Sequence, residues 1–227
     1  MKQALFFLLL TAFSMAAGCQ TPQQTKTIKE LDAQLRTGAL SISQALTDPQ
    51  WMPLHSLTAF RELIKQNARA ERIKLTPPGE PGLNITVQGA VADRDGRPVR
   101  DALIYVYQTS AKGWYADTAA HILMREGDMG HARLFGYLKT DREGRFAFET
   151  IRPAGYPKSD LPAHIHIALW AAGGQPIHGM PGELLFEEDE RLTPERKKQA
   201  LDYGYVVAKN TGTADQPVYA YRLVQQE

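Results

Sequence analysis

The chain has 227 residues, of which 43% are hydrophobic, enough for one main core with a small appendage. Lys and Arg total 26 against 25 Asp and Glu, so there is no excess of positive charge to attract a phosphate backbone. This balance argues against nucleic acid as a partner.

Residues 1–18 have the layout of a signal peptide. Lys2 is followed by an apolar run at residues 4–13 and by small residues at 16–18. The apolar run is too short for a membrane-spanning helix, which needs about 20 residues. We therefore expect an exported protein from which this segment is removed.

The only cysteine of the chain, Cys19, directly follows this segment, so no disulfide can form within the chain. Its position after small residues resembles the processing site of bacterial lipoproteins. The resemblance implies a lipid on Cys19 that anchors the mature protein to a membrane. Gln20 implies sorting to the outer membrane, facing the periplasm. The alternative is ordinary secretion with an unmodified Cys19.

Residues 19–27 are polar and lack an apolar period, which predicts a tether between the lipid and the fold. Beyond them, Ile28, Leu31 and Leu35 recur at helical spacing. Gly38 is typical of a residue that ends a helix.

A second apolar stripe includes Phe60 and predicts a helix that begins at about Asp48 or Ser56 and ends at Arg72. Such a stripe is typical of a packing face. The run of Pro and Gly at residues 77–82 interrupts both helix and strand and marks a domain boundary.

This boundary separates an N-terminal helical segment at residues 28–76 from a larger domain at residues 83–227. From Leu83 the apolar period changes to two, with Ile85 and Val87 alternating with polar residues. Short runs of this kind recur between turn signals. The pattern predicts a mainly β protein, an antiparallel β-sandwich with a short N-terminal helical appendage.

Two turn sequences of similar composition occur at residues 93–96 and 141–144, and the second is expected to join two strands as a hairpin. The charged stretch at residues 187–198 indicates a solvated loop or a short helix. Residues 203–209 and 218–224 are expected to form the last strands.

The strongest chemical signal lies in the predicted strand at residues 162–169. Because side chains alternate along a strand, Ile165 and Ile167 are expected to face the core, while His164 and His166 point together to the other side. Two imidazoles held in this way can bind zinc, copper or iron. Paired histidines also occur on wet strand surfaces, where they bind nothing.

Two tyrosines are further candidate site residues beside the two histidines. Tyr156 lies between Gly155 and Pro157, which indicate a tight turn, and Tyr115 follows a strand predicted at residues 102–108. Taken singly, either tyrosine is more often a half-buried packing residue with a hydrogen-bonded hydroxyl.

The order of these elements resembles the intradiol ring-cleavage dioxygenases, the family of catechol 1,2-dioxygenase and protocatechuate 3,4-dioxygenase. The resemblance extends from about residue 88 to residue 189. The motifs that carry it lie at residues 89–98, 113–115, 139–144, 150–157 and 162–166.

The resemblance implies that Tyr115 and His164 are equatorial ligands of iron(III), and that Tyr156 and His166 are axial ligands. Phenolates are hard anionic donors that suit a hard ferric ion. The resemblance also implies that a catechol displaces Tyr156 and that dioxygen then attacks the bound ring. Cleavage between the two hydroxyl-bearing carbons would follow.

Two positions depart from the family pattern. Leu161 stands where the family usually has Arg, and Glu183 lies near a position that is usually Gln. Both changes remove a polar group that would assist the reaction. Arg133, between the two tyrosines, is a candidate for the missing catalytic cation, and the alternative is a surface Arg in a long loop.

Three functions are compatible with this pattern. The first is an iron(III) dioxygenase that acts on a small aromatic diol and dioxygen. The second is a non-catalytic β-sandwich module that binds iron or a catechol. The third, a zinc hydrolase, is disfavoured by the two tyrosines and by the lack of a general base. Assembly as a homodimer is left open.

Overall fold

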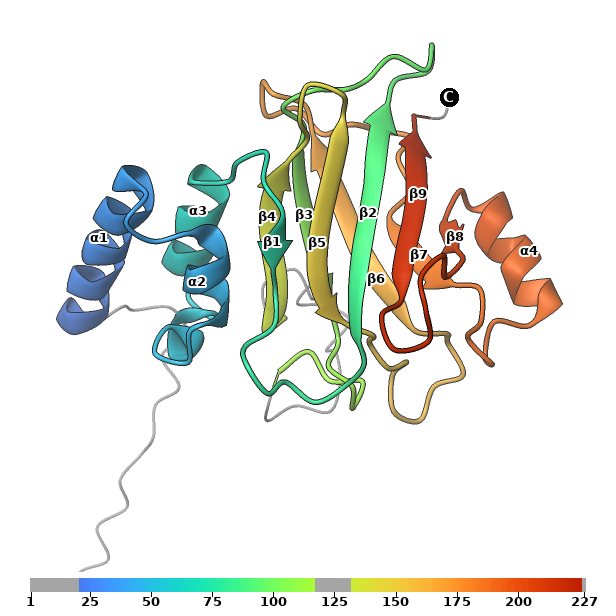
Figure 1. The fold of residues 1–227 in the computed structure, drawn as a ribbon, viewed down its shortest axis with the longest axis horizontal. Helices are drawn as coiled ribbons and strands as arrows, with labels where there is room; N and C mark the ends of the chain where they lie inside the picture. Colours follow the sequence, from blue (N-terminus) through green and yellow to red (C-terminus); the bar gives the residue numbers. More distant parts are fainter. Residues whose placement is uncertain (1–20, 117–131, 226–227) are drawn as a thin grey trace, which may run out of the picture.

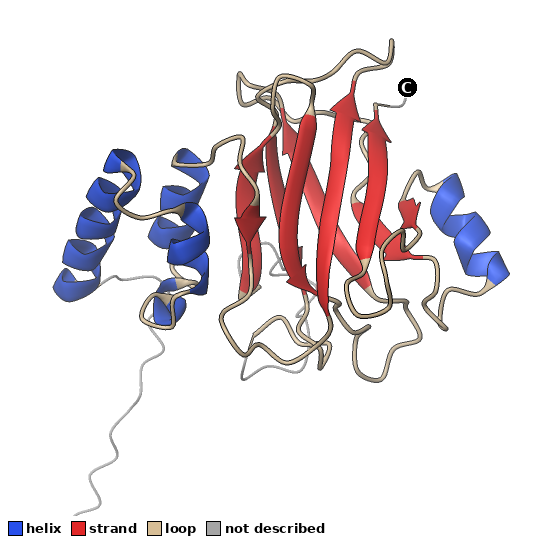
Figure 2. Ribbon diagram, viewed as in Figure 1, coloured by secondary structure: helices blue, strands red, loops and turns tan. Residues whose placement is uncertain are grey.

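The computed structural model describes residues 21–116 and 132–225, which form two packed β-sheets flanked by helices (Figure 1, Figure 2). The helices are α1 (Pro22–Thr37), α2 (Ile42–Thr47), the 3-10 helix η1 (Met52–Leu54), α3 (Thr58–Gln66) and α4 (Pro194–Asp202). The strands are β1 (Ile73–Lys74), β2 (Asn84–Ala92), β3 (Leu103–Gln108), β4 (Leu134–Lys139), β5 (Arg145–Ile151), β6 (His164–Trp170), β7 (Glu183–Phe186), β8 (Val206–Ala208) and β9 (Val218–Val224).

The strand order is β1-β5-β2-β9 in one sheet and β4-β3-β6-β7-β8 in the other. The predicted sandwich is confirmed, but its sheets are mixed because β1–β5, β2–β9 and β7–β8 are parallel pairs. Each parallel pair joins strands that are far apart in the sequence, as parallel pairing requires a long connection. The alternation of apolar and polar residues along one strand does not reveal whether the neighbouring strand runs parallel or antiparallel to it.

Helices α1 to α3 lie beside β1 and β4, and α4 lies at the opposite end of the sandwich (Figure 1). One hydrophobic core extends from the helices into the sandwich and includes the fully buried Leu31, Phe60, Phe148 and Ile165. Within the described part of the chain, no helix is both long enough and apolar enough to cross a lipid bilayer.

The predicted tether at residues 19–27 is wrong for residues 22–27, which belong to α1. Thr21 caps this helix: its hydroxyl accepts the main-chain N–H of Gln24, whose side chain accepts the N–H of Thr21 in return. Pro22 occupies the first helical position, which favours it. Gly38 ends α1 with φ 76°, as predicted.

The helix predicted from about Asp48 or Ser56 to Arg72 is confirmed only in part, because η1 lies at its start and α3 ends at Gln66. Asn67 caps α3 through its main-chain N–H, and the chain then turns into β1. Because β1 pairs with β5, the helical segment predicted at residues 28–76 supplies a strand to the sandwich. The apolar stripe through Phe60 is a packing face, as expected, since Phe60 is fully buried.

The hairpin predicted at residues 141–144 is wrong, because this turn joins β4 to β5, which lie in different sheets. The turn itself is confirmed: the carboxylate of Asp141 accepts the main-chain N–H groups of Glu143 and Arg145 at 2.9 and 2.7 Å. Turn chemistry sets the local bend and leaves open which sheet the next strand joins. The short helix α4 and the two last strands agree with prediction.

Candidate metal centre

Strand β6 places two histidines on the same side of its sheet. His164 and His166 flank Ile165, which is fully buried in the core. The predicted alternation is therefore confirmed. The ring of His166 stacks on Tyr107 of β3, with centroids 4.4 Å apart and an interplanar angle of 11°. This contact fixes the plane of the imidazole.

The main chain orients the other histidine. Nδ1 of His164 lies 2.9 Å from the carbonyl oxygen of Pro162. Because a carbonyl oxygen only accepts, Nδ1 carries the proton and the lone pair of the neutral ring is on Nε2. An orienting hydrogen bond of this kind is typical of histidines that bind metals.

Nε2 of each histidine faces the hydroxyl groups of Tyr115 and Tyr156. The two hydroxyl oxygens are 2.7 Å apart, and the two Nε2 atoms of His164 and His166 are 3.2 Å apart. Tyr115 Oη lies 2.8 Å from His166 Nε2, and Tyr156 Oη lies 2.9 Å from His164 Nε2. Atoms bound to one metal at about 2 Å lie about 3 Å from one another. The four predicted ligands therefore fit a single metal ion.

Burial keeps His166 neutral. Desolvation, followed by the charge of the neighbouring His164, lowers the pKa of His166 from 6.5 to about 3. His166 is therefore uncharged at neutral pH, the form in which an imidazole binds a metal.

The two loops that carry the tyrosines are joined by their main chains. The Thr109 hydroxyl donates to the carbonyl of Ala154 at 2.7 Å, and the N–H of Ala154 donates to the carbonyl of Ser110 at 3.1 Å. Gly113 has φ 76°, and a Cβ there would lie 2.3 Å from the carbonyl oxygen of Gly155. Only glycine at this position lets the loops meet. The sequence does not reveal this contact.

Glu183 of β7 lies opposite His166 in the strand register. Its carboxylate is 3.7 Å from His166 Nδ1, the ring nitrogen that faces away from the tyrosine hydroxyls. Among the described residues, His164, His166 and Glu183 offer ligand atoms within 4.8 Å of one another. Because Glu183 approaches Nδ1, it is better placed to support His166 than to bind the same metal.

Arg133 is not part of this cluster. Its guanidinium forms two hydrogen bonds with the Glu80 carboxylate, at 2.7 and 2.6 Å, in a mostly buried ion pair. The pair lines a separate hollow with Trp114. Its link to the centre is the main-chain N–H of Arg133, which donates to the carbonyl of Tyr115 at 2.7 Å. The structure gives no support to Arg133 as a catalytic cation.

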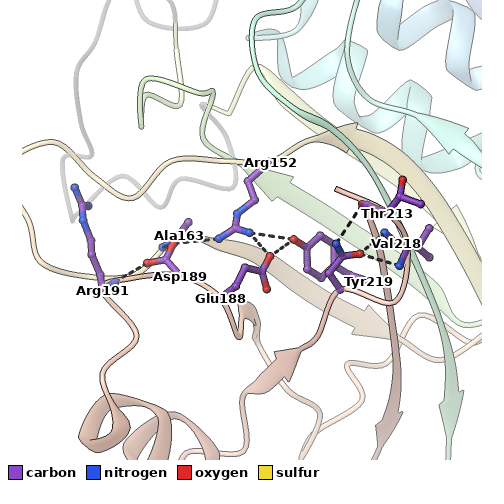
Figure 3. A network of polar contacts seen from close by, with 10 residues as sticks. Arg152, Ala163, Glu188, Asp189, Arg191, Thr213, Val218 and Tyr219 are labelled. Carbon is purple, nitrogen blue, oxygen red and sulfur yellow. Dashed lines mark hydrogen bonds and ion pairs between the residues drawn. The ribbon is translucent and has the colours of Figure 1, made fainter. Parts of the chain in front are cut away.

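A polar network contacts the main chain at Ala163, directly before β6 (Figure 3). Asp189 accepts the main-chain N–H of Ala163, the residue before His164, at 3.2 Å, and it pairs with Arg152 at 3.4 Å. Arg152 precedes the loop of Tyr156 and also donates to Glu188. The network therefore joins the tyrosine loop to the histidine strand. In the sequence, Arg152 and Ala163 appear only as parts of the matching motifs, and Glu188 and Asp189 belong to the charged stretch at residues 187–198.

A cavity of about 320 Å³ adjoins the cluster. Tyr156, His164 and Glu183 line this cavity, together with Leu161 and residues of α4. Cys19 and the predicted signal peptide at residues 1–18 lie outside the described residues.

Comparison with known proteins identifies the family of the chain. The model of a family described as "Dioxygenase" matches residues 59–224. The chain belongs to the intradiol ring-cleavage dioxygenase family. The predicted resemblance is thereby confirmed, and it covers α3 as well as the sandwich.

Individual relatives are similar over part of their length. The chain is 35% identical to a protocatechuate 3,4-dioxygenase beta chain from Burkholderia cepacia, over 54% of this chain and 57% of the relative. It is 37% identical to a catechol 1,2-dioxygenase from Candida albicans, over 31% of this chain and 22% of the relative. The matches thus span less than two thirds of these curated dioxygenases.

A solved structure shows the same fold. The dioxygenase domain of a dioxygenase carbohydrate-binding protein fusion from Streptomyces sp. SirexAA-E superposes with a TM-score of 0.50 at 22% identity. The match covers 69% of this chain and 88% of that domain.

Proposed function

We propose that this protein is a non-haem iron(III) dioxygenase that cleaves catechol-type aromatics between the two hydroxyl-bearing carbons. The observation that carries the proposal is the convergence of two phenol oxygens and two imidazole nitrogens at about 3 Å spacing. Two phenolates neutralise two of the three charges of a ferric ion, so this donor set favours iron(III) over zinc. The net reaction adds both atoms of dioxygen and yields a muconate-type diacid.

The four candidate ligands would have different roles because they differ in their access to the cavity. Tyr156 lines the cavity, so its phenolate oxygen is the base that takes a proton from an entering diol. Tyr115 is buried, at 4% exposure, and would stay in place as His164 and His166 do. Bound iron would draw electron density from the diol and make its ring reactive toward dioxygen.

Oxygen uptake by the iron-loaded protein with a panel of catechols tests this function. We expect about one iron per chain, a visible phenolate-to-iron band and oxygen consumption with at least one diol. Tyr156→Phe should shift the band, and His164→Ala should weaken iron binding. Stoichiometric zinc in a colourless protein would overturn the proposal.

The alternative is a module that binds iron or a catechol without cleaving it. Leu161 favours this alternative, because an exposed apolar side chain stands where the family resemblance places Arg. A catechol-induced change of the visible band without oxygen uptake would identify such a module.

We also propose that the protein is exported and anchored through a lipid on Cys19, in the outer membrane and facing the periplasm. The support is the order of charged, apolar and small residues before the single cysteine. Mass spectrometry of the membrane fraction should find lipidated Cys19 as the new N-terminus. A soluble product with an unmodified Cys19 would contradict this.

A further inference from the structure

A row of aromatic rings leads away from the candidate metal centre along β3. Tyr107 lies directly opposite His166 in the register of β3 and β6, and the two rings are stacked 4.4 Å apart. Tyr105, two residues earlier on β3, faces the same side and stacks on Tyr107 at 5.2 Å with an interplanar angle of 25°. Tyr105 and Tyr107 are buried, at 1% and 8% exposure. The row therefore connects His166 to a ring buried deeper in the protein.

The orientation of His166 depends on this row. The lone pair of an imidazole lies in the plane of the ring, so a rotated ring no longer directs Nε2 at a metal. For His164, the hydrogen bond of 2.9 Å to the carbonyl of Pro162 restrains this plane. The Glu183 carboxylate lies 3.7 Å from Nδ1 of His166, which is longer than a hydrogen bond. The stacked ring of Tyr107 is therefore a main restraint on the plane of His166.

An arginine of the helical appendage contacts the far end of the row. Arg61 of α3 is 7% exposed and donates to the hydroxyl of Tyr105 at 3.1 Å and to the carbonyl of Ala132. Its guanidinium lies over the ring of Phe135 on β4, 3.9 Å from the centroid. A planar guanidinium can make these contacts together because its donors form a rigid fork. Arg61 thus fixes the phenol of Tyr105 relative to β4.

The burial of Arg61 costs free energy. Desolvation lowers its pKa, because the charged form loses its contact with water. An apolar side chain of similar volume is often at least as stabilising as a buried charge. What Arg61 contributes beyond packing is therefore the orientation of the groups that accept its hydrogen bonds.

We infer that Arg61 and Tyr107 are positioning residues for the metal centre. Arg61 orients Tyr105, and the stacked rings of Tyr105 and Tyr107 set the plane of the His166 imidazole. The helical appendage, which holds none of the candidate ligands, would in this way determine the direction of one of them. The metal that His166 would bind rests on the proposed function, whereas the orientation of its ring does not.

Nuclear magnetic resonance of the metal-free protein tests this inference. The carbon-bound protons of His166, identified by their loss in His166→Asn, lie over the face of the Tyr107 ring and should resonate upfield of an ordinary histidine. Tyr107→Leu should abolish this ring-current shift. Arg61→Met keeps the length of the side chain but removes its charge and its donors, and it should reduce the shift.

A double-mutant cycle isolates the contact between Arg61 and Tyr105. Tyr105→Phe removes the hydroxyl that accepts from Arg61 and keeps the stacked ring. It should reduce the shift as Arg61→Met does, and the double variant should add nothing because both changes break the same contact. Arg61→Lys retains a donor and should lie between wild type and Arg61→Met. Arg69→Met is the matched control, since Arg69 is an exposed arginine of the appendage that donates to the carbonyl of Leu35.

The iron-loaded protein gives a second readout. Competition with a chelator should show an iron affinity about tenfold lower in Tyr107→Leu and in Arg61→Met, as for other groups that orient a metal ligand. The phenolate-to-iron band should shift in both variants. Arg69→Met should match wild type in affinity and in colour.

The outcomes separate this inference from the proposed function. If Arg61→Met lowers the unfolding free energy but leaves the His166 resonances and the iron affinity of the folded protein unchanged, Arg61 is only structural and the inference is overturned. Should Arg61→Met fail to fold, Arg61→Lys and Tyr105→Phe are judged by the same two measurements. If the resonances respond as expected but the protein binds no iron, the proposed function fails and the positioning of His166 stands.

Discussion

At the scale of single residues, Glu183 brings its carboxylate to 3.7 Å from Nδ1 of His166, whose Nε2 is the proposed metal ligand. A carboxylate beside Nδ1 orients the ring and makes Nε2 a stronger donor. The position is visible in the sequence as a departure from the usual glutamine. Its contact with His166 depends on the β6–β7 register, which the sequence does not specify.

We expect Glu183→Gln to weaken ferric iron binding about tenfold, because the charge that supports His166 is lost while the shape of the side chain is kept. Competition with a chelator measures the change. Glu187→Gln is the control, since Glu187 is an exposed residue that pairs with Lys197. Equal affinities for the two variants would contradict a supporting role for Glu183.

The contacts of Asp189 predict an effect on both stability and colour. Asp189→Ala leaves the N–H of Ala163 and the guanidinium of Arg152 without this acceptor, which should cost roughly 1–3 kcal/mol of unfolding free energy. Because Ala163 precedes His164, the phenolate-to-iron band should also shift. Denaturant unfolding and visible spectra measure the two effects.

Two comparisons complete this test. Asp189→Asn keeps an oxygen acceptor and should lie between wild type and Asp189→Ala. Asp202→Ala removes an exposed partner of Lys198 and should be neutral. A loss of stability with an unchanged band would limit Asp189 to a structural role.

At the scale of elements, the strand that carries the histidines is predictable because its signal is local. Buried Ile165 between His164 and His166 fixes which face each side chain takes. The tyrosines could be selected only through family resemblance, because nothing near Tyr115 in the sequence shows that its loop meets that of Tyr156. The hairpin predicted at residues 141–144 is wrong for the same reason. Which strands pair with each other depends on residues far apart in the sequence.

The contact between the tyrosine loops can be broken with one methyl group. Gly113→Ala would place its Cβ 2.3 Å from the carbonyl of Gly155, so the loops should separate and iron affinity should fall by at least tenfold. Gly79→Ala is a matched control with the same φ of 76° and no atom within 4 Å of the added Cβ. Equal iron affinity in both variants would show that the loop contact is not needed for metal binding.

At the scale of the whole molecule, His55 joins the helical appendage to the sandwich. It follows η1, stacks on Phe60 at 5.0 Å and meets Phe135 of β4 edge-on at 5.4 Å, and its Nδ1 lies 3.0 Å from the carbonyl oxygen of Arg133. Burial lowers the pKa of His55 to about 4 from its ordinary value of 6.5.

This shift predicts how stability depends on pH. The neutral ring is favoured in the folded protein, so between pH 6.5 and about 4 the unfolded chain binds more protons, and stability falls as the pH falls through this window. The full contribution is of the order of 3 kcal/mol. Stability should not change from this source above the unfolded pKa.

Unfolding of the metal-free protein at several pH values measures this dependence. His55→Asn keeps a donor for the Arg133 carbonyl and should reduce the slope between pH 6.5 and 4, leaving the part that His166 contributes. His178→Asn, at an exposed histidine, should leave the slope as it is in wild type. An unchanged slope in His55→Asn would mean that the buried His166 alone accounts for it.

The two-residue strand β1 covers part of the edge of its sheet. It occupies the edge beside β5, so the main-chain groups of β5 on that side are partly paired within the chain. An uncovered edge of this kind recruits strands from other chains and leads to aggregation. A protein shortened to the sandwich would keep every candidate metal ligand yet expose β5. The helical appendage, which supplies none of the candidate metal ligands, is thus followed by a strand that covers part of the β5 edge.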